Sequence, residues 1–393
     1  MTVWQIKPRQ PPSTHHHSPT TIQKLRANGC GVKKKQEVCG MAFSNEIMAW
    51  YQLHKRDLPW RHTRDPYVIW LSEVILQQTR VEQGLPYFYR FLEHYPTVTD
   101  FANAPEDEIL RHWQGLGYYS RARNMHAAAK TVVADYNGVF PSRYDQLIRL
   151  KGVGEYTAAA IASFSANEVK AVVDGNVFRV LARYFGVPEA INSPKGKRLF
   201  QELAQSLIPA EQPGLYNQAI MEFGALQCRP KTPVCARCVL QPGCHAYHAG
   251  TIDELPVKTK AKPSRNRYFN YFVVVDNDRI LMHKRGKGDI WQNLYELPLI
   301  ETPQPTSLSA LAHLPEVIDL FGRQASLRAA AASVKHVLSH QNLFAQFVVV
   351  DSRDASIALA KKVGGDYVFI KDLNTLAKPK LIFSFLEEFM VGL

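Results

Sequence analysis

Four of the six cysteines lie within seventeen residues, spaced as Cys228-x6-Cys235-x2-Cys238-x5-Cys244. Four thiolates this close together suit a zinc ion or an iron–sulphur cluster. Zinc ribbons present two separated Cys-x2-Cys pairs, whereas here one pair is flanked by single cysteines, so the spacing favours a [4Fe–4S] cluster over zinc. Because no second cluster or flavin motif is visible, we expect a structural role for the cluster.

One carboxyl group, that of Glu73, stands in an apolar helical pattern, DPYVIWLSEVILQQTRVEQ. Most of its neighbours on the helix face are apolar, namely Ile69, Trp70 and Leu76. Such surroundings raise the pKa of a carboxyl group and keep it protonated, as a general acid requires near neutral pH. The alternative is a glutamate whose side chain reaches solvent.

A second carboxyl group, that of Asp174, follows three apolar residues in KAVVDGNVFRVLAR. Its position predicts an N-cap for the helix that runs through Arg183. A functional interpretation places its negative charge beside a DNA sugar, and Gly175 and Asn176 suit a tight approach there. Capping and catalysis can coexist at one residue, so both interpretations stand.

The stretch LKGVGEYTA (150–158) has the form of two helices joined by a glycine turn. Gly152 and Gly154 permit a positive φ and a close backbone approach, so the N–H groups that open the second helix can face a DNA phosphate. A plain helix–helix corner is the alternative. Gln77-Gln78-Thr79, at the end of the Glu73 helix, suit base edges or a gap in a duplex.

These residues need a mostly helical scaffold. Over residues 41–250 helical patterns recur with short breaks at Pro or Gly, which predicts an all-α domain closed by the cysteines. Residues 251–267 are polar and basic, as in a linker. Strand patterns at 268–275 and 344–350, with helices between and after them, predict an α+β domain over 268–393.

The net charge of +12 invites a nucleic-acid interpretation, but the tail holds half of it. Residues 1–40 carry seven Lys and Arg against one Glu, lack an apolar period and are expected to be disordered. An apolar stripe then begins at Met41, with Ser44 as the expected N-cap. No signal peptide or apolar run of roughly 18 residues is present, so we expect a cytoplasmic protein without a membrane span.

Three features stand in one order along the chain: Glu73 in SEVILQQT, the glycine turn with Asp174 about twenty residues later, and the spaced cysteines. This order resembles the helix-hairpin-helix DNA glycosylase superfamily with an iron–sulphur cluster, and within it the MutY-type adenine DNA glycosylases. The resemblance covers about 44–390 and is most specific over 44–246. The matching motifs are DLPWR (57–61), WLSEVILQQT (70–79), GLGYYSRARN (115–124), GVGEYTA, VDGNV (173–177) and NQAIMEFGALQC (217–228).

The resemblance implies that adenine opposite 8-oxoguanine or G is flipped out of duplex DNA and removed. Glu73 then protonates adenine N7, and Asp174 stabilises the oxocarbenium-like sugar. Asn176 and Tyr156 orient these carboxylates. The implied substrate-binding and DNA-binding residues are Trp60, Arg61 and Glu222 at the adenine pocket, Gln78 and Tyr118 in the duplex, Gly152 and Gly154 at a phosphate, and Gln218.

Tyr156 bears on how far the reaction goes. Endonuclease III-like relatives of this family carry a lysine at this position, which forms a Schiff base and lets the strand be cut. A tyrosine forms no Schiff base, so we expect base removal alone. One alternative, a lyase for oxidised pyrimidines, conflicts with the missing lysine and the extra C-terminal domain. The other, a non-catalytic damage-binding protein, conflicts with the presence of both Glu73 and Asp174.

The C-terminal part resembles the MutT-like, or Nudix-like, domain with which this family reads 8-oxoguanine. VKHVLSHQNLF (334–344) matches its recognition loop, with Ser339 and His340 in place and Leu338 where the family often has Phe. The Nudix hydrolase signature is absent after Leu297-Pro298, so no nucleotide hydrolysis is expected. The implied protein is a monomer that binds duplex DNA and associates with the nucleoid.

Overall fold

The computed structural model describes residues 33–259, 263–351 and 357–391. Its contacts divide the chain into two compact units. The described part of unit 1 combines residues 33–56 with 169–259, and unit 2 combines 57–168 with the chain from 260 onward. The expected boundaries followed chain order, whereas the structure places 57–168 as an insertion between the two parts of unit 1.

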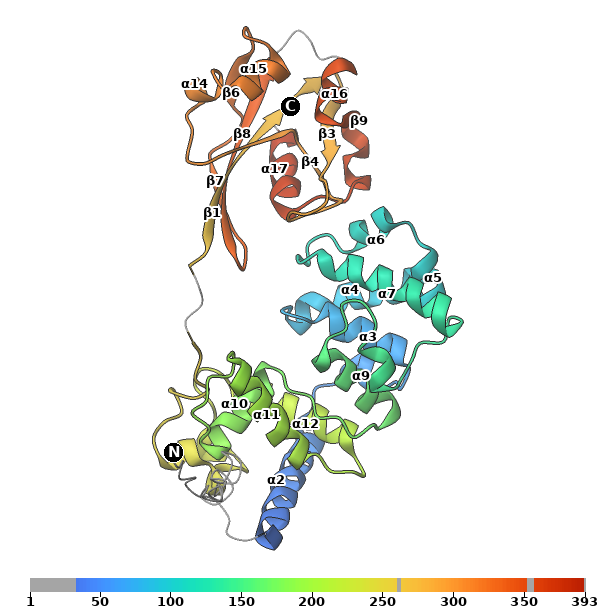
Figure 1. The fold of residues 1–393 in the computed structure, drawn as a ribbon, viewed down its shortest axis with the longest axis vertical. Helices are drawn as coiled ribbons and strands as arrows, with labels where there is room; N and C mark the ends of the chain where they lie inside the picture. The colour runs from blue at the N-terminus through green and yellow to red at the C-terminus, as the bar shows by residue number, and fades with distance from the viewer. Residues whose placement is uncertain (1–32, 260–262, 352–356, 392–393) are drawn as a thin grey trace, which may run out of the picture. The chain divides into compact units, whose positions relative to one another are not determined.

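The described part of unit 1 is helical, and its first helix pairs with one of its last. Helix α2 (Lys33–His54) lies along α12 (Pro213–Leu226), although the whole insertion separates them in sequence (Figure 1). Buried side chains of the two helices, including Ile47 and Phe223, share one core. The remaining elements are α10 (Gly175–Phe185), α11 (Pro194–Leu207), η2 (Cys235–Arg237), η3 (Gln241–Gly243) and α13 (His245–His248).

The first helix of the described residues, α2, already includes Lys33, eight residues before Met41. Ser44 therefore lies inside α2, where its hydroxyl donates to the backbone carbonyls of Gly40 and Met41, and the prediction that it caps the helix was wrong. The run KKKQEV consists largely of strong helix formers and holds no proline, which explains the earlier start. Residues 1–32, the rest of the expected disordered tail, lie outside the described residues.

The linker is shorter at both ends than residues 251–267. Ile252 and Leu255 pack against the core of unit 1, and their backbone carbonyls each accept a hydrogen bond from Arg183 Nε at 3.0 Å. Strand β1 already begins at Arg265. The polar and basic composition of this stretch predicted a linker and did not indicate that its two apolar residues pack against the core.

The helices of unit 2 surround α3 (Pro66–Ile75), which is buried along most of its length. Asp65 caps α3 by accepting the N–H of Tyr67 at 2.8 Å, and Pro66 fills the first turn. Among the described residues, no helix has the length and apolar character to cross a membrane. The other helices of residues 57–168 are η1 (Pro59–Arg61), α4 (Val81–His94), α5 (Val98–Asn103), α6 (Glu106–His112), α7 (Ser120–Tyr136), α8 (Tyr144–Leu147) and α9 (Glu155–Ala166).

The C-terminal part of unit 2 is α+β, as expected. Its first sheet has the order β5-β1-β8-β6, with β7 also paired to β8, and only the central β1–β8 pair is parallel. The second sheet has the order β2-β3-β4, with β9 on β3. The strands are β1 (Arg265–Val273), β2 (Val275–Asp276), β3 (Arg279–Lys284), β4 (Tyr295–Glu296), β5 (Leu299–Thr302), β6 (Ser326–Ala329), β7 (Val334–Val337), β8 (Gln341–Asp351) and β9 (Gly365–Phe369).

Helices cover both faces of the first sheet. Helix α17 (Lys380–Val391) packs Phe385 flat against Phe347 of β8, with the ring centroids 3.8 Å apart. On the other face, α15 (Pro315–Phe321) packs Phe321 against Phe272 of β1. The remaining helices are α14 (Leu308–Leu311), α16 (Ile357–Val363) and η4 (Ile370–Thr375).

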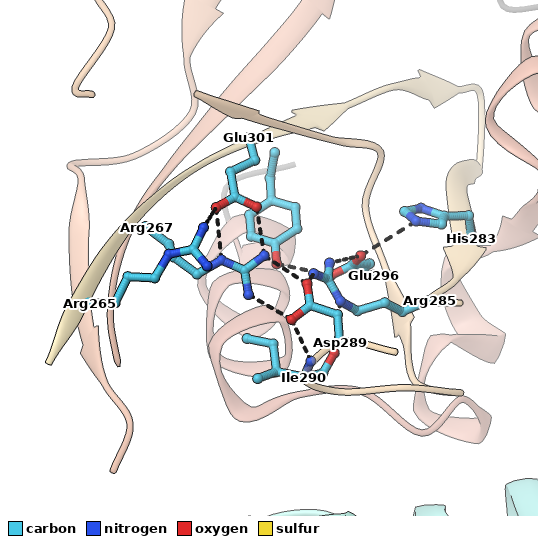
Figure 2. A network of polar contacts seen from close by, with 9 residues as sticks. Arg265, Arg267, His283, Arg285, Asp289, Ile290, Glu296 and Glu301 are labelled. Atoms are coloured by element: carbon cyan, nitrogen blue, oxygen red, sulfur yellow. Dashed lines mark hydrogen bonds and ion pairs between the residues drawn. The ribbon is translucent and has the colours of Figure 1, made fainter. Parts of the chain in front are cut away.

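A network of arginines and acids ties this domain together (Figure 2). Arg267 of β1 binds both Asp289 and Glu301 through paired hydrogen bonds of 2.6 to 2.8 Å. Arg285 reaches Asp289 and the buried Glu296 of β4. The arginines hold the pKa of Asp289 well below its usual range. The loop between β3 and β4 is therefore joined to β1 by the paired hydrogen bonds between the buried Arg267 and the more exposed Asp289.

Candidate active site

Glu73 lies on α3, and its side chain is buried, with 9% of the residue exposed. The hydroxyl of Tyr156 donates to its Oε2 at 2.7 Å. Tyr156 stands in the first turn of α9, and a hydrogen bond from Gln77, in the turn after α3, to Thr157 lies beside it. The glutamate therefore does not extend into solvent. The carboxyl group that Tyr156 contacts in the structure is that of Glu73, and its role in orienting that group stays a prediction.

The glycine turn before α9 has two glycines with different requirements. Gly152 has φ +80°, and a Cβ there would lie 2.7 Å from the side chain of Asn124. Both its conformation and its packing therefore demand glycine. Gly154 has φ −92°, and nothing lies within 4 Å of the Cβ it lacks. Gly154 thus leaves the exposed start of α9 open to approach, while phosphate binding there stays a prediction.

Asp174 caps α10, as predicted. Its Oδ1 accepts the backbone N–H groups of Asn176 at 2.9 Å and Val177 at 2.8 Å, and its Oδ2 accepts the Asn176 side-chain amide at 2.7 Å. Burial raises the pKa of Asp174, and these hydrogen bonds oppose that rise. The carboxyl group is thus held in one orientation by the start of its own helix.

Two arginines of α10, which the sequence did not single out, connect this aspartate to the cysteine loop. Arg179 donates to Asn176 Oδ1 at 2.8 Å and to the backbone carbonyls of Gly224 and Cys228 at 2.7 Å each. Arg183 donates to Cys228 Sγ at 3.6 Å and to two further loop carbonyls. The sequence signal for this role was a pair of arginines four residues apart in FRVLAR, and the structure shows that both are buried. The side-chain amide that holds Asp174 is thus linked to Cys228.

The four cysteines lie in one loop, and Cys228, Cys238 and Cys244 pack against the core of unit 1. Burial raises the pKa of the Cys238 thiol to about 11, and the neighbouring thiols add to that rise. A bound metal would supply the positive charge that stabilises the thiolates, so four thiols are the donor type that a thiolate-ligated group requires. Their arrangement does not by itself form such a site, because no set of three or more His, Cys, Asp or Glu among the described residues is placed to hold a metal ion.

The residues expected at an adenine pocket are divided between the units. Trp60 and Arg61 belong to η1 of unit 2, where Trp60 is buried. Glu222 belongs to α12 of unit 1 and is 1% exposed. Both its carboxylate oxygens bind the guanidinium of Arg56, at 2.9 and 2.7 Å. The sequence did not identify Arg56. A pocket role for the three expected residues stays a prediction.

The remaining expected DNA-binding residues are mostly exposed. Gln78 and Tyr118 both have a positive φ, of 56° and 48°, and both lie in turns of unit 2. Ser339 and His340 form the exposed turn between β7 and β8. Gln218, which is half-buried, instead accepts a hydrogen bond from Tyr51 within unit 1. The first four are accessible to a macromolecular ligand.

Comparisons with known proteins agree with these features. The family model described as "HhH-GPD superfamily base excision DNA repair protein" matches residues 71–209, and a NUDIX domain model matches 270–388. An adenine DNA glycosylase of Buchnera aphidicola (subspecies Baizongia pistaciae) is 34% identical over 260 residues, which are 66% of this chain and 74% of that protein. The adenine DNA glycosylase of Mus musculus is 40% identical over 227 residues, 55% of this chain and 44% of that protein.

Other glycosylases are also similar to the helical part. A thymine/uracil-DNA glycosylase of Methanothermobacter thermautotrophicus is 34% identical, over 54% of this chain and 95% of that protein. The solved structure of a thermostable thymine-DNA glycosylase matches with a TM-score of 0.50 and 32% identity, over 53% of this chain and 97% of that one.

The family model over residues 71–209 and the similarity to these relatives place the chain among the helix-hairpin-helix proteins of base excision DNA repair. The similarity over 74% of the Buchnera protein makes the assignment more specific. The chain belongs to the adenine DNA glycosylase family.

Proposed function

We propose that this protein removes adenine paired with 8-oxoguanine, or with G, from duplex DNA and leaves the strand intact. The observation that carries the proposal is the hydrogen bond from Tyr156 to Glu73. It places a hydroxyl, which forms no Schiff base, against the buried acid. Helix α9 contains no lysine, so it supplies no amine for strand cleavage.

The two carboxyl groups have opposed tasks in this proposal. Glu73 accepts the Tyr156 hydroxyl on Oε2 and, in its protonated form, protonates adenine N7. The bond between C1′ and N9 then breaks, and its electron pair leaves with adenine. Water adds to C1′, and the proton it releases restores Glu73.

Asp174 supplies the negative charge for the cationic sugar. Its side chain accepts three hydrogen bonds, all from Asn176 and Val177, so no reorganisation of the carboxylate is needed as the positive charge develops. Arg179 in turn holds the Asn176 amide. Family membership and this preorganised geometry support the assignment.

The exposed turn between β7 and β8 is the proposed reader of the opposite base. Ser339 offers a hydroxyl and His340 a ring nitrogen, both accessible in the described structure. Leu338 stands beside them and is half-buried, with its N–H bound to the Gln341 carbonyl at 2.9 Å. The NUDIX family match over this region supports the proposal.

Single-turnover incubation with a labelled duplex tests the proposal. One substrate holds A opposite 8-oxoguanine, a second holds A opposite G, and each sample is divided and read with and without hot alkali. We expect breaks only after alkali, and faster reaction opposite 8-oxoguanine. Breaks without alkali would mean that another amine attacks the sugar.

A matched duplex with T or U opposite G separates the adenine assignment from the activity named for the Methanothermobacter relative. Excision of T or U in preference to A would replace the proposed substrate. Tight binding to the adenine mispairs with no excision in any sample would instead favour a damage-binding protein.

We further propose that Cys228, Cys235, Cys238 and Cys244 hold a [4Fe–4S] cluster of structural role. Replacing Cys235 by Ser should abolish the brown absorbance of the purified protein and reduce its affinity for DNA, because the loop that Arg179 and Arg183 grip would lose its order. Absorbance spectra, metal analysis and binding titrations measure this. Colourless wild-type protein that contains zinc would contradict the cluster.

A further inference from the structure

One half-buried guanidinium, that of Arg121 on α7, joins two turns of unit 2. The first turn follows α3 and carries Gln78, and the second precedes α7 and carries Tyr118. The bonds to the first turn run from Nη1 to the carbonyls of Val74 (2.8 Å), Ile75 (3.2 Å) and Gln77 (2.7 Å). The bonds to the second run from Nη2 to Gly117 (3.3 Å) and Leu116 (3.5 Å).

Aromatic rings fix the same guanidinium. Its central carbon lies 5.0 Å from the ring centroid of the buried Trp113 and 5.6 Å from that of Tyr118. Trp113 Nε1 also donates to the Gly117 carbonyl at 3.0 Å, so the side chains of Arg121 and Trp113 bind the same carbonyl. Burial lowers the pKa of Arg121 to about 10, which leaves it charged at neutral pH.

The two turns need such support because their backbones are strained. Gln78 and Tyr118 are non-glycine residues with a positive φ, a conformation that persists only where the surroundings enforce it. Gly115 and Gly117, with φ of 101° and 72°, complete the second turn. Gln78 and Tyr118 nevertheless remain exposed, with Tyr118 at 45%.

We propose that Arg121 is a positioning residue that sets the two turns so that Gln78 and Tyr118 enter the duplex and unstack the adenine. The inference rests on the proposed function, since removal of adenine requires that base to leave the stack, and on the family resemblance, which implies that both side chains lie in the duplex. In this proposal Arg121 acts in the unstacking step, before the glycosidic bond breaks. A lysine at this position would offer one point charge and could not replace the forked guanidinium, which binds both turns.

The test separates unstacking from chemistry. In full-length protein carrying Glu73→Gln, a 2-aminopurine beside the target adenine reports unstacking by its fluorescence when the protein binds the A·8-oxoguanine duplex. We expect Arg121→Lys to lose most of the fluorescence rise while duplex affinity stays within a few-fold. With Glu73 intact, the single-turnover rate should fall about tenfold or more. Arg111→Lys, an exposed arginine on α6, is the matched control.

A double-mutant cycle distinguishes positioning from general damage to the fold. If Arg121 acts through Tyr118, Arg121→Lys should cost little more in a Tyr118→Ala protein, whereas additive losses would overturn the inference. An unchanged fluorescence rise in Arg121→Lys would also overturn it. Should Arg121→Lys fail to fold, Arg121→Gln, which keeps a single donor group at this position, takes its place, and an unchanged rise there overturns the positioning role.

Failure of the proposed function gives a different result. If wild-type protein excises no adenine but Arg121→Lys still lowers the fluorescence rise, the proposed function fails and the inference stands.

Discussion

Replacing Glu73 by Gln is expected to abolish adenine excision while duplex binding stays within a few-fold. The amide keeps the size of the side chain and still accepts the Tyr156 hydroxyl, but it carries no proton strong enough to activate adenine. Loss of a general acid of this kind typically costs about 10²–10⁴-fold in rate. Single-turnover rates and binding titrations on the A·8-oxoguanine duplex measure the two effects separately.

Tyr156→Phe is the matched comparison for this substitution. It removes only the hydroxyl that donates to Glu73 Oε2 at 2.7 Å. The acid remains and loses its orientation, so a smaller loss, of about tenfold, is expected. A Glu73→Gln protein that cleaves at the normal rate would show that another group is the acid.

Asp174→Asn should lose nearly all activity without loss of stability. Asparagine caps helices about as well as aspartate, so the bonds to the N–H groups of Asn176 and Val177 can remain. The negative charge that we propose for stabilising the sugar disappears, and loss of a preorganised electrostatic group costs on the order of 10²–10³-fold in rate. Thermal unfolding and single-turnover rates together test both halves of the prediction.

The chain offers a matched control for that substitution. Asp65 caps α3 through the N–H of Tyr67, in the same way that Asp174 caps α10. Asp65→Asn should leave both stability and excision rate nearly unchanged. If both variants lost the same stability, and their activity fell only as much as that loss explains, Asp174 would be a structural cap without a role in catalysis.

Local patterns revealed the parts of the site that lie within one helix or turn. The helical pattern around Glu73 predicted its burial, three apolar residues before DGN predicted the cap at Asp174, and GVG predicted the turn before α9. In each case the neighbours in sequence are also the neighbours in space. The all-helical and α+β parts were predicted for the same reason.

The roles of four arginines could not be identified from the sequence, because their partners are distant in the chain or are backbone atoms. Arg179 binds carbonyls from the segment after α12, Arg121 binds carbonyls after α3, and Arg56 binds Glu222. Arg183 likewise grips the loop at Cys228. A guanidinium that binds carbonyls leaves no complementary charge in the sequence, so it resembles an ordinary surface arginine.

The grouping of the chain into units was also beyond local patterns. Nothing in residues 33–56 indicates that their apolar side chains pack against residues that follow a long insertion. The family resemblance predicted the order of the motifs along the chain, but it did not predict these long-range contacts.

That discontinuity has a consequence for synthesis of the chain on the ribosome. Phe43, Ile47 and Tyr51 of α2 are made early, but the core that buries them includes α12 and is completed only after the insertion has emerged. Closing so long a loop costs little extra entropy, since the cost rises only with the logarithm of its length. During that interval the apolar face of α2 is uncovered, and the nascent chain exposes apolar surface of the kind that chaperones bind, which folding later buries.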